Sequence, residues 1–475
     1  MTISEHFNLN KSQAELDFIN IDPDNDIPLF LDPHFLSKRV DRWSIEATLT
    51  LKSFFQEIID LIRANNFDDA RLLFDHLHEP NATCLGLSVG TPDGNGVGSS
   101  DTTRIFNSLI SSRAIQTGLI QDIQDSILFV DYFGKDKLSD MTTNIITKHL
   151  IDYTIAQCDL HNIPLTNNIP SGHYWSRQQN DWLAEHCRRL VINGKPLLLV
   201  PKGIASFCKA YTPETYYNHF VLNFLQDENI RIRSALVQTT KKGVRFVTKK
   251  SIKENNPINK GFLRDFTTRH PEILERFKDR VITNPLQNDE ISNISYSAVA
   301  LDLISRLRQI PGGNHDASAY HQLVLGILEF LFYPDLINPV KEREIHNGRK
   351  RIDITFDNAS KSGIFYRVSE NMRIFCPFIF VECKNYTSDP ANPELDQLSG
   401  RFSFNSGRLG ILTCRNFTNR ELFIQRCSDT YRDDRGLILP LEDNDLINML
   451  QNANERNREY VETYLSNIVR EVAIN

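Results

Sequence analysis

The sequence lacks paired cysteines, long hydrophobic runs and internal repeats, and each absence excludes a class of protein. The eight cysteines include no C-x-x-C pair, which argues against zinc ribbons and dithiol redox motifs and favours reduced thiols. No apolar run approaches the roughly 18 residues of a membrane-spanning helix. The first residues show no basic end followed by an apolar stretch, so we expect no secretory signal. These absences predict a cytoplasmic protein that does not contact a membrane.

Two catalytic signatures are also missing. The sequence contains neither a G-x-x-x-x-G-K-[ST] phosphate-binding loop nor a G-x-S-x-G nucleophile elbow. A weaker glycine-rich stretch, residues 94–98, precedes an expected helix, and Asp131, Asp136 and Asp140 follow it. These residues leave a nucleotide-binding enzyme in the N-terminal part as one alternative. A flexible turn, helix capping and solvation explain them more simply.

Length and charge indicate several domains and one basic segment. The chain has 475 residues, 40% hydrophobic and 24% charged, which predicts two or three globular domains. The net charge of −7 is uneven, because residues 231–280 carry 14 Lys and Arg against 5 Asp and Glu. Such a segment indicates contact with a polyanion, with a solvated face as the alternative. The candidate nucleic-acid contacts are Lys241, Lys242, Arg245, Lys249 and Lys250.

Periodicity predicts an N-terminal part of α/β or α+β class. We expect helices over 43–65, 68–77, 139–158 and 175–192, and strands over 84–89, 126–133 and 196–203. Further on, we expect a hairpin that turns at Lys242-Gly243 and a helical segment broken at Pro271. The expected divisions are a sensing or oligomerising module at 1–229, a basic connection at 230–290 and a last domain at 291–475.

The last domain shows the order helix-strand-strand-strand-helix-strand. A helix is expected over 316–332 and a hairpin around Asn347-Gly348. A strand over 378–384, a helix from 392 to about 404 and a strand over 408–414 complete the pattern.

Charged residues gather on one face of these strands. In the strand FIFVECK, alternation places Phe380, Glu382 and Lys384 on the same side. A two-residue turn in the hairpin places Glu342 opposite Asp353, and Asp353 lies between residues that are expected to be buried. A divalent metal shared by Asp353 and Glu382 would satisfy both carboxylates. The alternative is a strand-end ion pair.

These residues resemble the PD-(D/E)xK nuclease superfamily, which has the restriction-endonuclease-like fold. Asp353 matches the acidic residue after the hairpin turn, Glu382-Cys383-Lys384 match the (D/E)-x-K motif, and Gln397 matches a helix glutamine found in some branches. The resemblance covers residues 316–415 and implies the α-β-β-β-α-β core of that fold.

The resemblance implies a site for Mg²⁺, or Mn²⁺, held by Asp353, Glu382 and the backbone carbonyl of Cys383. Glu342 is a candidate replacement for the helix carboxylate that many members carry, because Glu329 is expected to be solvated. Lys384 would position or deprotonate the attacking water, or neutralise the transition state. Gln397 would orient Lys384 or the phosphate. Arg351 and Arg401 would contact the nucleic-acid backbone, and for Arg401 a surface ion pair with Asp396 or Glu394 is the alternative.

The resulting expectation is a magnesium-dependent DNA endonuclease, similar to bacterial restriction and anti-phage defence proteins. Homo-oligomerisation would gate its activity, and a phage-derived molecule or a nucleotide is the expected trigger at residues 1–229. Two alternatives stay open: a catalytically inert protein that uses the nuclease fold as a nucleic-acid clamp, and the N-terminal nucleotide-binding enzyme. The sequence does not separate DNA from RNA as the substrate.

Overall fold

Two clusters of buried hydrophobic side chains divide the molecule. The computed structural model describes residues 1–78, 80–86, 99–111, 115, 118–292, 294–341, 354–390 and 392–474. One cluster extends from Ile3 to Leu286, and the other extends from Ala300 to Val472 and also takes in Ala14 and Leu160. Helices and strands mix in both halves, which confirms the α+β class. Among the described residues, no helix is both long and apolar enough to span a membrane.

The N-terminal half packs helices around short antiparallel strands. Its helices are α1 (Ile3–His6), α2 (Pro33–Ser37), α3 (Arg42–Arg63), α4 (Phe67–Phe74), α5 (Ser99–Ser111), α7 (Ser126–Phe129), α8 (Lys135–Ile145) and α9 (Thr147–His161). Its strands are β1 (Phe30–Leu31), β2 (Thr166–Pro170), β3 (Tyr174–Ser176), β4 (Asp181–Leu183), β5 (His186–Ile192), β6 (Lys195–Leu197) and β7 (Ala205–Ser206). The expected helix over 43–65 is confirmed as α3, which Asp41 caps by accepting from the Ser44 N–H.

Several N-terminal predictions are wrong. The expected strand over 126–133 begins as α7, since a short apolar run does not separate a buried helix from a strand. The expected helix over 175–192 is instead β3, β4 and β5, because residues 177–180 form a turn that pairs Trp175 with Trp182. The expected helix over 139–158 is two helices that meet at Ile146. Of the expected strand at 84–89, Leu85 forms a bridge to Ile27, and residues 87–89 lie outside the described residues.

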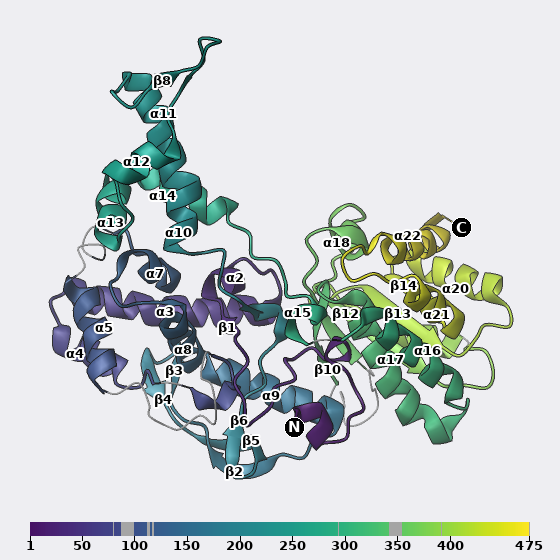
Figure 1. Ribbon diagram of the computed structural model, residues 1–475. Helices are drawn as coiled ribbons and strands as arrows, with labels where there is room; N and C mark the ends of the chain where they lie inside the picture. Colours follow the sequence, from purple (N-terminus) through teal and green to yellow (C-terminus); the bar gives the residue numbers. More distant parts are fainter. Residues whose placement is uncertain are drawn as a thin grey trace.

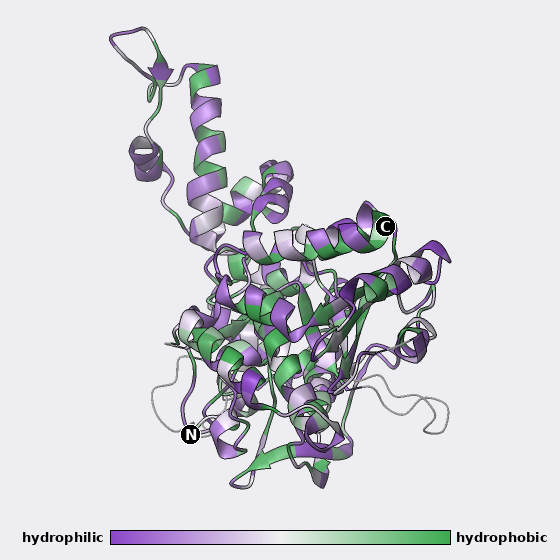
Figure 2. Cartoon of the chain, turned by 90° about the vertical axis from the view of Figure 1, so that its right-hand side faces the viewer, coloured by the Kyte–Doolittle hydropathy of each residue, from purple (hydrophilic) through white to green (hydrophobic). Residues whose placement is uncertain are grey.

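A basic arm, residues 231–253, projects from helices that follow the N-terminal half (Figures 1 and 2). The region contains α10 (Pro213–Tyr216), α11 (Leu222–Ile232), β8 (Gln238–Thr239), β9 (Arg245–Phe246), α12 (Lys249–Asn255), α13 (Lys260–Arg269) and α14 (Pro271–Arg280). The expected hairpin is confirmed by the β8–β9 pair, and Gly243 takes the left-handed φ of 80° that its turn requires. The break at Pro271 is also confirmed, because Pro271 begins α14.

The C-terminal half is a five-stranded sheet covered by helices (Figure 1, green to yellow). Its strands are β10 (Leu336–Val340), β11 (Ile354–Asn358), β12 (Phe378–Lys384), β13 (Leu409–Cys414) and β14 (Leu437–Glu442), paired in that order. The β10–β11 and β11–β12 pairs are antiparallel, and the β12–β13 and β13–β14 pairs are parallel. The helices are α15 (Asn288–Ile291), α16 (Tyr296–Gln309), α17 (Ala317–Phe332), α18 (Gly363–Glu370), α19 (Asn392–Ser399), α20 (Arg420–Arg432), α21 (Asp443–Gln451) and α22 (Glu459–Ile474).

The expected elements of this half are largely present. α17, β12 and β13 occupy the expected ranges, and α19 ends at Ser399 rather than near residue 404. The hairpin around Asn347-Gly348 lies outside the described residues. Its expected register also requires Val340 to face Thr355, and the structure pairs those two residues. The strand that contains Val340 begins at Leu336, which the sequence pattern did not reveal, and α18, α20, β14, α21 and α22 were not expected.

Candidate functional site

A buried carboxylate lies near the carboxyl end of β12. The strand is almost fully buried, and Glu382 is 1% exposed. A carboxylate in such surroundings is costly unless it is paired with cations or hydrogen-bond donors. Asn385 fixes the strand end directly afterwards by donating to the carbonyls of Pro311 and Gly313, at 3.0 and 2.7 Å.

Two cations meet at Glu382. Lys384 Nζ lies 2.6 Å from Glu382 Oε1, and Arg401 Nη1 lies 2.7 Å from Glu382 Oε2. Both cations are largely shielded from solvent, with side-chain exposures of 12% and 4%. Arg401 also has two buried nitrogens, Nε and Nη2, without a hydrogen-bond partner in the part of the chain that the structure describes. Arg401 therefore has N–H donors that no described residue uses, and such donors suit an anion.

The two faces of β12 have different roles. Gly410, the β13 neighbour of Phe380, has no side chain, and a Cβ there would lie 2.9 Å from atoms of Leu398 and Phe402. This close approach brings α19 and the turn after it over the face that carries Glu382. The opposite face packs against α17. Arg401, which is 19 residues away in the sequence, can therefore reach Glu382 on this face.

The structure places some predicted site residues and leaves others untested. Gln397 is half-buried on α19, and the Cys383 side chain is 1% exposed. Asp353, Glu342 and Arg351 lie outside the described residues. The alternative for Arg401, a surface ion pair with Asp396 or Glu394, does not form, because Arg401 is buried against Glu382 and Asp396 pairs with Arg435 at 2.8 Å.

The expectation that Glu329 is solvated is wrong. Glu329 lies on α17 and is 2% exposed, because the N-terminal half covers the side of α17 that turns away from the sheet. Neither of its carboxylate oxygens has a hydrogen-bond partner within the described ranges. Burial raises the pKa of Glu329 to about 8, against the opposing charges of Lys11 and Lys202. Glu329 is therefore a mostly protonated acid at neutral pH.

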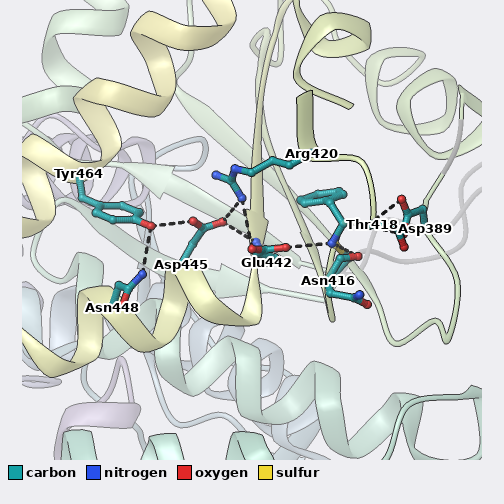
Figure 3. Close-up of polar contacts among 10 residues, drawn as sticks. Asp389, Asn416, Thr418, Arg420, Glu442, Asp445, Asn448 and Tyr464 are labelled. Carbon is teal, nitrogen blue, oxygen red and sulfur yellow. Dashed lines mark hydrogen bonds and ion pairs between the residues drawn. The ribbon is translucent and has the colours of Figure 1, made fainter. Parts of the chain in front are cut away.

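A second group of carboxylates lies beyond the carboxyl ends of β13 and β14 (Figure 3). Asp445 accepts from Arg420 at 2.8 Å and from the Tyr464 hydroxyl at 2.7 Å. Glu442 accepts from the Phe417 N–H, and Asp389 accepts from the Thr418 N–H. These bonds hold α20, α21 and α22 to the sheet. We therefore assign this network a structural role.

The basic arm carries basic side chains and no acidic ones. It contains eight Lys and Arg residues and no Asp or Glu. Lys241, Lys242, Arg245 and Lys250 are exposed. Lys249 differs from them, because it is half-buried and its ammonium donates to the Asn218 carbonyl at 2.7 Å.

The described residues give no support to the alternative of an N-terminal nucleotide-binding enzyme. The glycine-rich stretch at 94–98 lies outside them. Asp136 and Asp140 lie on α8, and Asp131 pairs with Arg264 at 3.6 Å. Across the described ranges, no group of three or more His, Cys, Asp or Glu residues has the arrangement of a metal site.

Comparison with known proteins adds one match. Residues 8–212 match the model of a family described as a domain of unknown function (DUF8370). The matched segment covers most of the N-terminal half and ends before the basic arm. No curated protein and no solved structure matches the chain.

Proposed function

We propose that the C-terminal half is a metal-dependent nuclease of the PD-(D/E)xK type, with DNA as the favoured substrate. The observation that carries the proposal is the buried Glu382 between Lys384 and Arg401, near the carboxyl end of the central strand. The order of α17, β10, β11, β12, α19 and β13 supports the proposal, since it is the order of the restriction-endonuclease-like core. α18 is an insertion between the second and third strands.

We assign the second carboxylate to Asp353. Ile354 pairs with Val381 across the antiparallel β11–β12 ladder. Asp353 precedes Ile354 in the sequence and Glu382 follows Val381, so the same pairing, if continued by one step, would bring the two carboxylates opposite each other. Glu342 is the proposed third carboxylate, because the hairpin register places it opposite Asp353.

These donors suit Mg²⁺, which takes oxygen ligands, commonly from one or two carboxylates, and keeps several waters. Asp353, Glu382 and the Cys383 carbonyl would hold the ion. When bound, it would lower the pKa of a coordinated water and polarise the phosphate. Lys384 and Arg401 each contact one oxygen of Glu382, and each carboxylate oxygen has a further lone pair that could serve the ion.

The protein residues then have separate roles. Lys384 would hold the attacking water or neutralise the charge that develops on the phosphate. Arg401 would donate its two unused N–H groups to phosphate oxygens. Gln397, one turn before Arg401, would orient Lys384 or the phosphate. Exclusion of water around Glu382 strengthens each of these electrostatic interactions.

The rest of the molecule fits a regulated nuclease. We propose that Lys241, Lys242, Arg245 and Lys250 of the basic arm, with Arg351, bind the nucleic-acid backbone, and that Lys249 fixes α12. The N-terminal half would sense a phage-derived molecule or a nucleotide in the cytoplasm, and self-association would gate the site. These assignments would place the protein among bacterial restriction or anti-phage defence systems.

A second candidate is an inert nucleic-acid clamp. This candidate is favoured by the two ion pairs of Glu382. A buried carboxylate that already binds two cations does not need a metal to offset the cost of its burial. The two candidates differ in whether phosphodiester bonds break.

Plasmid DNA separates the two candidates. The nuclease predicts cleavage by the wild-type protein in Mg²⁺, none in EDTA and none by Glu382→Gln. Asp396→Asn is the matched control, because Asp396 lies on α19 in an exposed pair with Arg435. Binding without cleavage by every protein would establish the clamp, and equal cleavage by wild type and Glu382→Gln would refute this site.

The basic arm has its own test. Replacing Lys241, Lys242 and Arg245 with Ala should weaken DNA binding in Ca²⁺ and flatten its salt dependence, by roughly 0.9 log units per log salt for each duplex phosphate that is no longer bound. The single-turnover rate at saturating DNA should not change. Lys249→Ala is the control, because the Lys249 ammonium already binds the Asn218 carbonyl. An unchanged salt slope in the triple variant would show that the arm does not bind DNA.

A further inference from the structure

The outer end of the basic arm is a narrow two-stranded hairpin. Thr240 closes its turn, because its N–H donates to the Val244 carbonyl at 2.9 Å and its hydroxyl accepts from the Val244 N–H at 3.1 Å. Gly243 takes the left-handed φ of 80° that ends a three-residue turn of this kind. Lys241 and Lys242 therefore lie at the tip of the hairpin, which points away from the body of the molecule (Figures 1 and 2).

The base of the hairpin is fixed to the helices beside it. The Gln226 side-chain amide, on α11, donates to the Val247 carbonyl at 2.5 Å. The Val247 side chain is 2% exposed, and Thr248 caps α12 by accepting from the Ser251 N–H. A hairpin of this size is marginally stable by itself. The protein therefore holds an exposed hairpin at a set place through contacts at its base.

The basic side chains of the neighbouring helices serve the fold, whereas those of the hairpin face solvent. Lys260 donates to two backbone carbonyls after α7, at 2.5 and 2.7 Å, and Lys278 pairs with Asp125 at 2.8 Å. The hairpin has three basic side chains, all of them exposed: Lys241, Lys242 and Arg245. Residues 231–253 contain no Asp or Glu that could neutralise them. The hairpin thus concentrates positive charge, and a polyanion complements it.

An apolar side chain lies directly behind the tip. The β8–β9 ladder pairs Gln238 with Phe246 and Thr239 with Arg245. Because successive residues of a strand point to opposite faces, Val244 lies on the same face as Phe246, and Arg245 lies on the other. Val244 is 61% exposed, whereas Phe246 is half-buried. The end of the ribbon therefore combines cations with an exposed apolar group.

The dimensions of this ribbon match one groove of duplex DNA. The major groove of B-form DNA, about 12 Å wide and about 8.5 Å deep, admits a two-stranded ribbon, whereas the minor groove is only about 6 Å wide. From Gln238 to Lys241 the strand extends about 10 Å, at about 3.3 Å per residue. The hairpin can therefore reach the floor of the major groove. In A-form RNA the major groove is too deep and narrow for side chains to read.

We propose that the β8–β9 hairpin enters the major groove of duplex DNA, with its cations on the phosphates of the groove walls and Val244 against the base edges. This inference deepens the proposed function and rests on its assignment of the basic arm to nucleic acid. The apolar group that a base edge displays in this groove is the thymine methyl, so Val244 favours thymine under the tip. The arm, rather than the metal site, then distinguishes DNA from RNA.

Altered duplexes test the groove without any need for cleavage. Fluorescence anisotropy in Ca²⁺ compares an A·T-rich DNA duplex, the same duplex with uracil in place of thymine, and the RNA duplex of the same sequence. Uracil lacks only the methyl group in the major groove, so wild type should bind the uracil duplex about fourfold more weakly, the effect of one buried methyl group. The RNA duplex should bind more than about tenfold more weakly, because its major groove does not admit the hairpin.

Val244→Ser removes the apolar group and keeps all the cations of the arm. This variant should bind the thymine and uracil duplexes equally, and its salt slope should match that of wild type, because the phosphate contacts remain. Leu72→Ser is the matched control, since Leu72 is 60% exposed on α4, outside the arm. The control should keep the fourfold difference between the two duplexes.

Groove-filling dyes provide a measurement on the wild-type protein alone. Methyl green, which occupies the major groove, should displace the protein from DNA, and netropsin, which occupies the minor groove, should not. This result does not depend on how well any variant folds. Displacement by netropsin but not by methyl green would place the arm in the wrong groove and overturn the inference.

The remaining outcomes separate the inference from the proposed function. Equal binding of the thymine, uracil and RNA duplexes by wild type would show that the arm contacts only the backbone, which overturns the inference and leaves the nuclease assignment intact. The same holds if Val244→Ser keeps the preference for thymine. If wild type shows the expected preferences but does not cleave DNA in Mg²⁺, the nuclease assignment fails and the inference stands.

Discussion

Glu382 and Glu329 are two buried carboxylates of the same half, and their surroundings differ in kind. Glu382 is held between Lys384 and Arg401 at 2.6 and 2.7 Å. Glu329 has no hydrogen-bond partner in the described part of the chain, and burial raises its pKa to about 8. The protein therefore stabilises the charged form of Glu382 and the neutral form of Glu329. A carboxylate kept charged in a water-poor place can serve a metal, whereas a neutral one is a poor ligand.

The largest expected effect is on catalysis at Glu382. Glu382→Gln and Lys384→Met should each lower the single-turnover cleavage rate by about 10²–10³-fold or more, because each removes a charge from the transition-state environment. Glu329→Gln should change the rate by less than about threefold, since glutamine resembles the protonated acid. A Glu329→Gln variant as inactive as Glu382→Gln would contradict the distinction between the two carboxylates.

The next effect is on stability at Arg401. Arg401→Met removes one of the two cations that lie against Glu382 among the described residues, and the free energy of unfolding should fall by about 3 kcal/mol, as for a broken buried ion pair. Arg435→Met, which breaks the exposed pair with Asp396, should cost less than about 1 kcal/mol. Urea unfolding of both variants measures the difference. Equal losses would show that burial does not strengthen the Glu382 cluster.

The last effect is the pH dependence of stability that Glu329 imposes. Its pKa is about 8 in the folded chain, against the usual value of 4.5. The folded state therefore binds the proton more tightly, and the contribution to stability is complete below pH 4.5 and lost as the pH rises to about 8. Glu329→Gln should raise the free energy of unfolding by up to about 4 kcal/mol at pH 8 and by less than about 1 kcal/mol at pH 5. Thermal unfolding at the two pH values checks the sign, and a variant destabilised at pH 8 would show that Glu329 is charged and paired.

Secondary-structure elements could be predicted from the sequence more accurately than contacts between residues that are far apart in the chain. β12 and α17 were found because a short continuous apolar run and helical spacing are local signals. β10 was missed because Asn338 and Pro339 interrupt its pattern at a bulge. The burial of Glu329 was missed because a helix packed on two sides has no solvated face, and periodicity assumes one. Arg401 was placed near the site, but its bond to Glu382 depends on Gly410, whose missing side chain brings the turn close.

β10 lies at one edge of the five-stranded sheet. An uncovered edge offers free backbone groups to any other strand, which promotes aggregation. Here a proline, a bulge and the packing of α9 block that edge. A C-terminal fragment that begins near residue 294 would lack α9 and expose the edge. We therefore expect such a fragment to precipitate when expressed alone and to be rescued by co-expression of residues 1–292, which would make the N-terminal half an intramolecular chaperone.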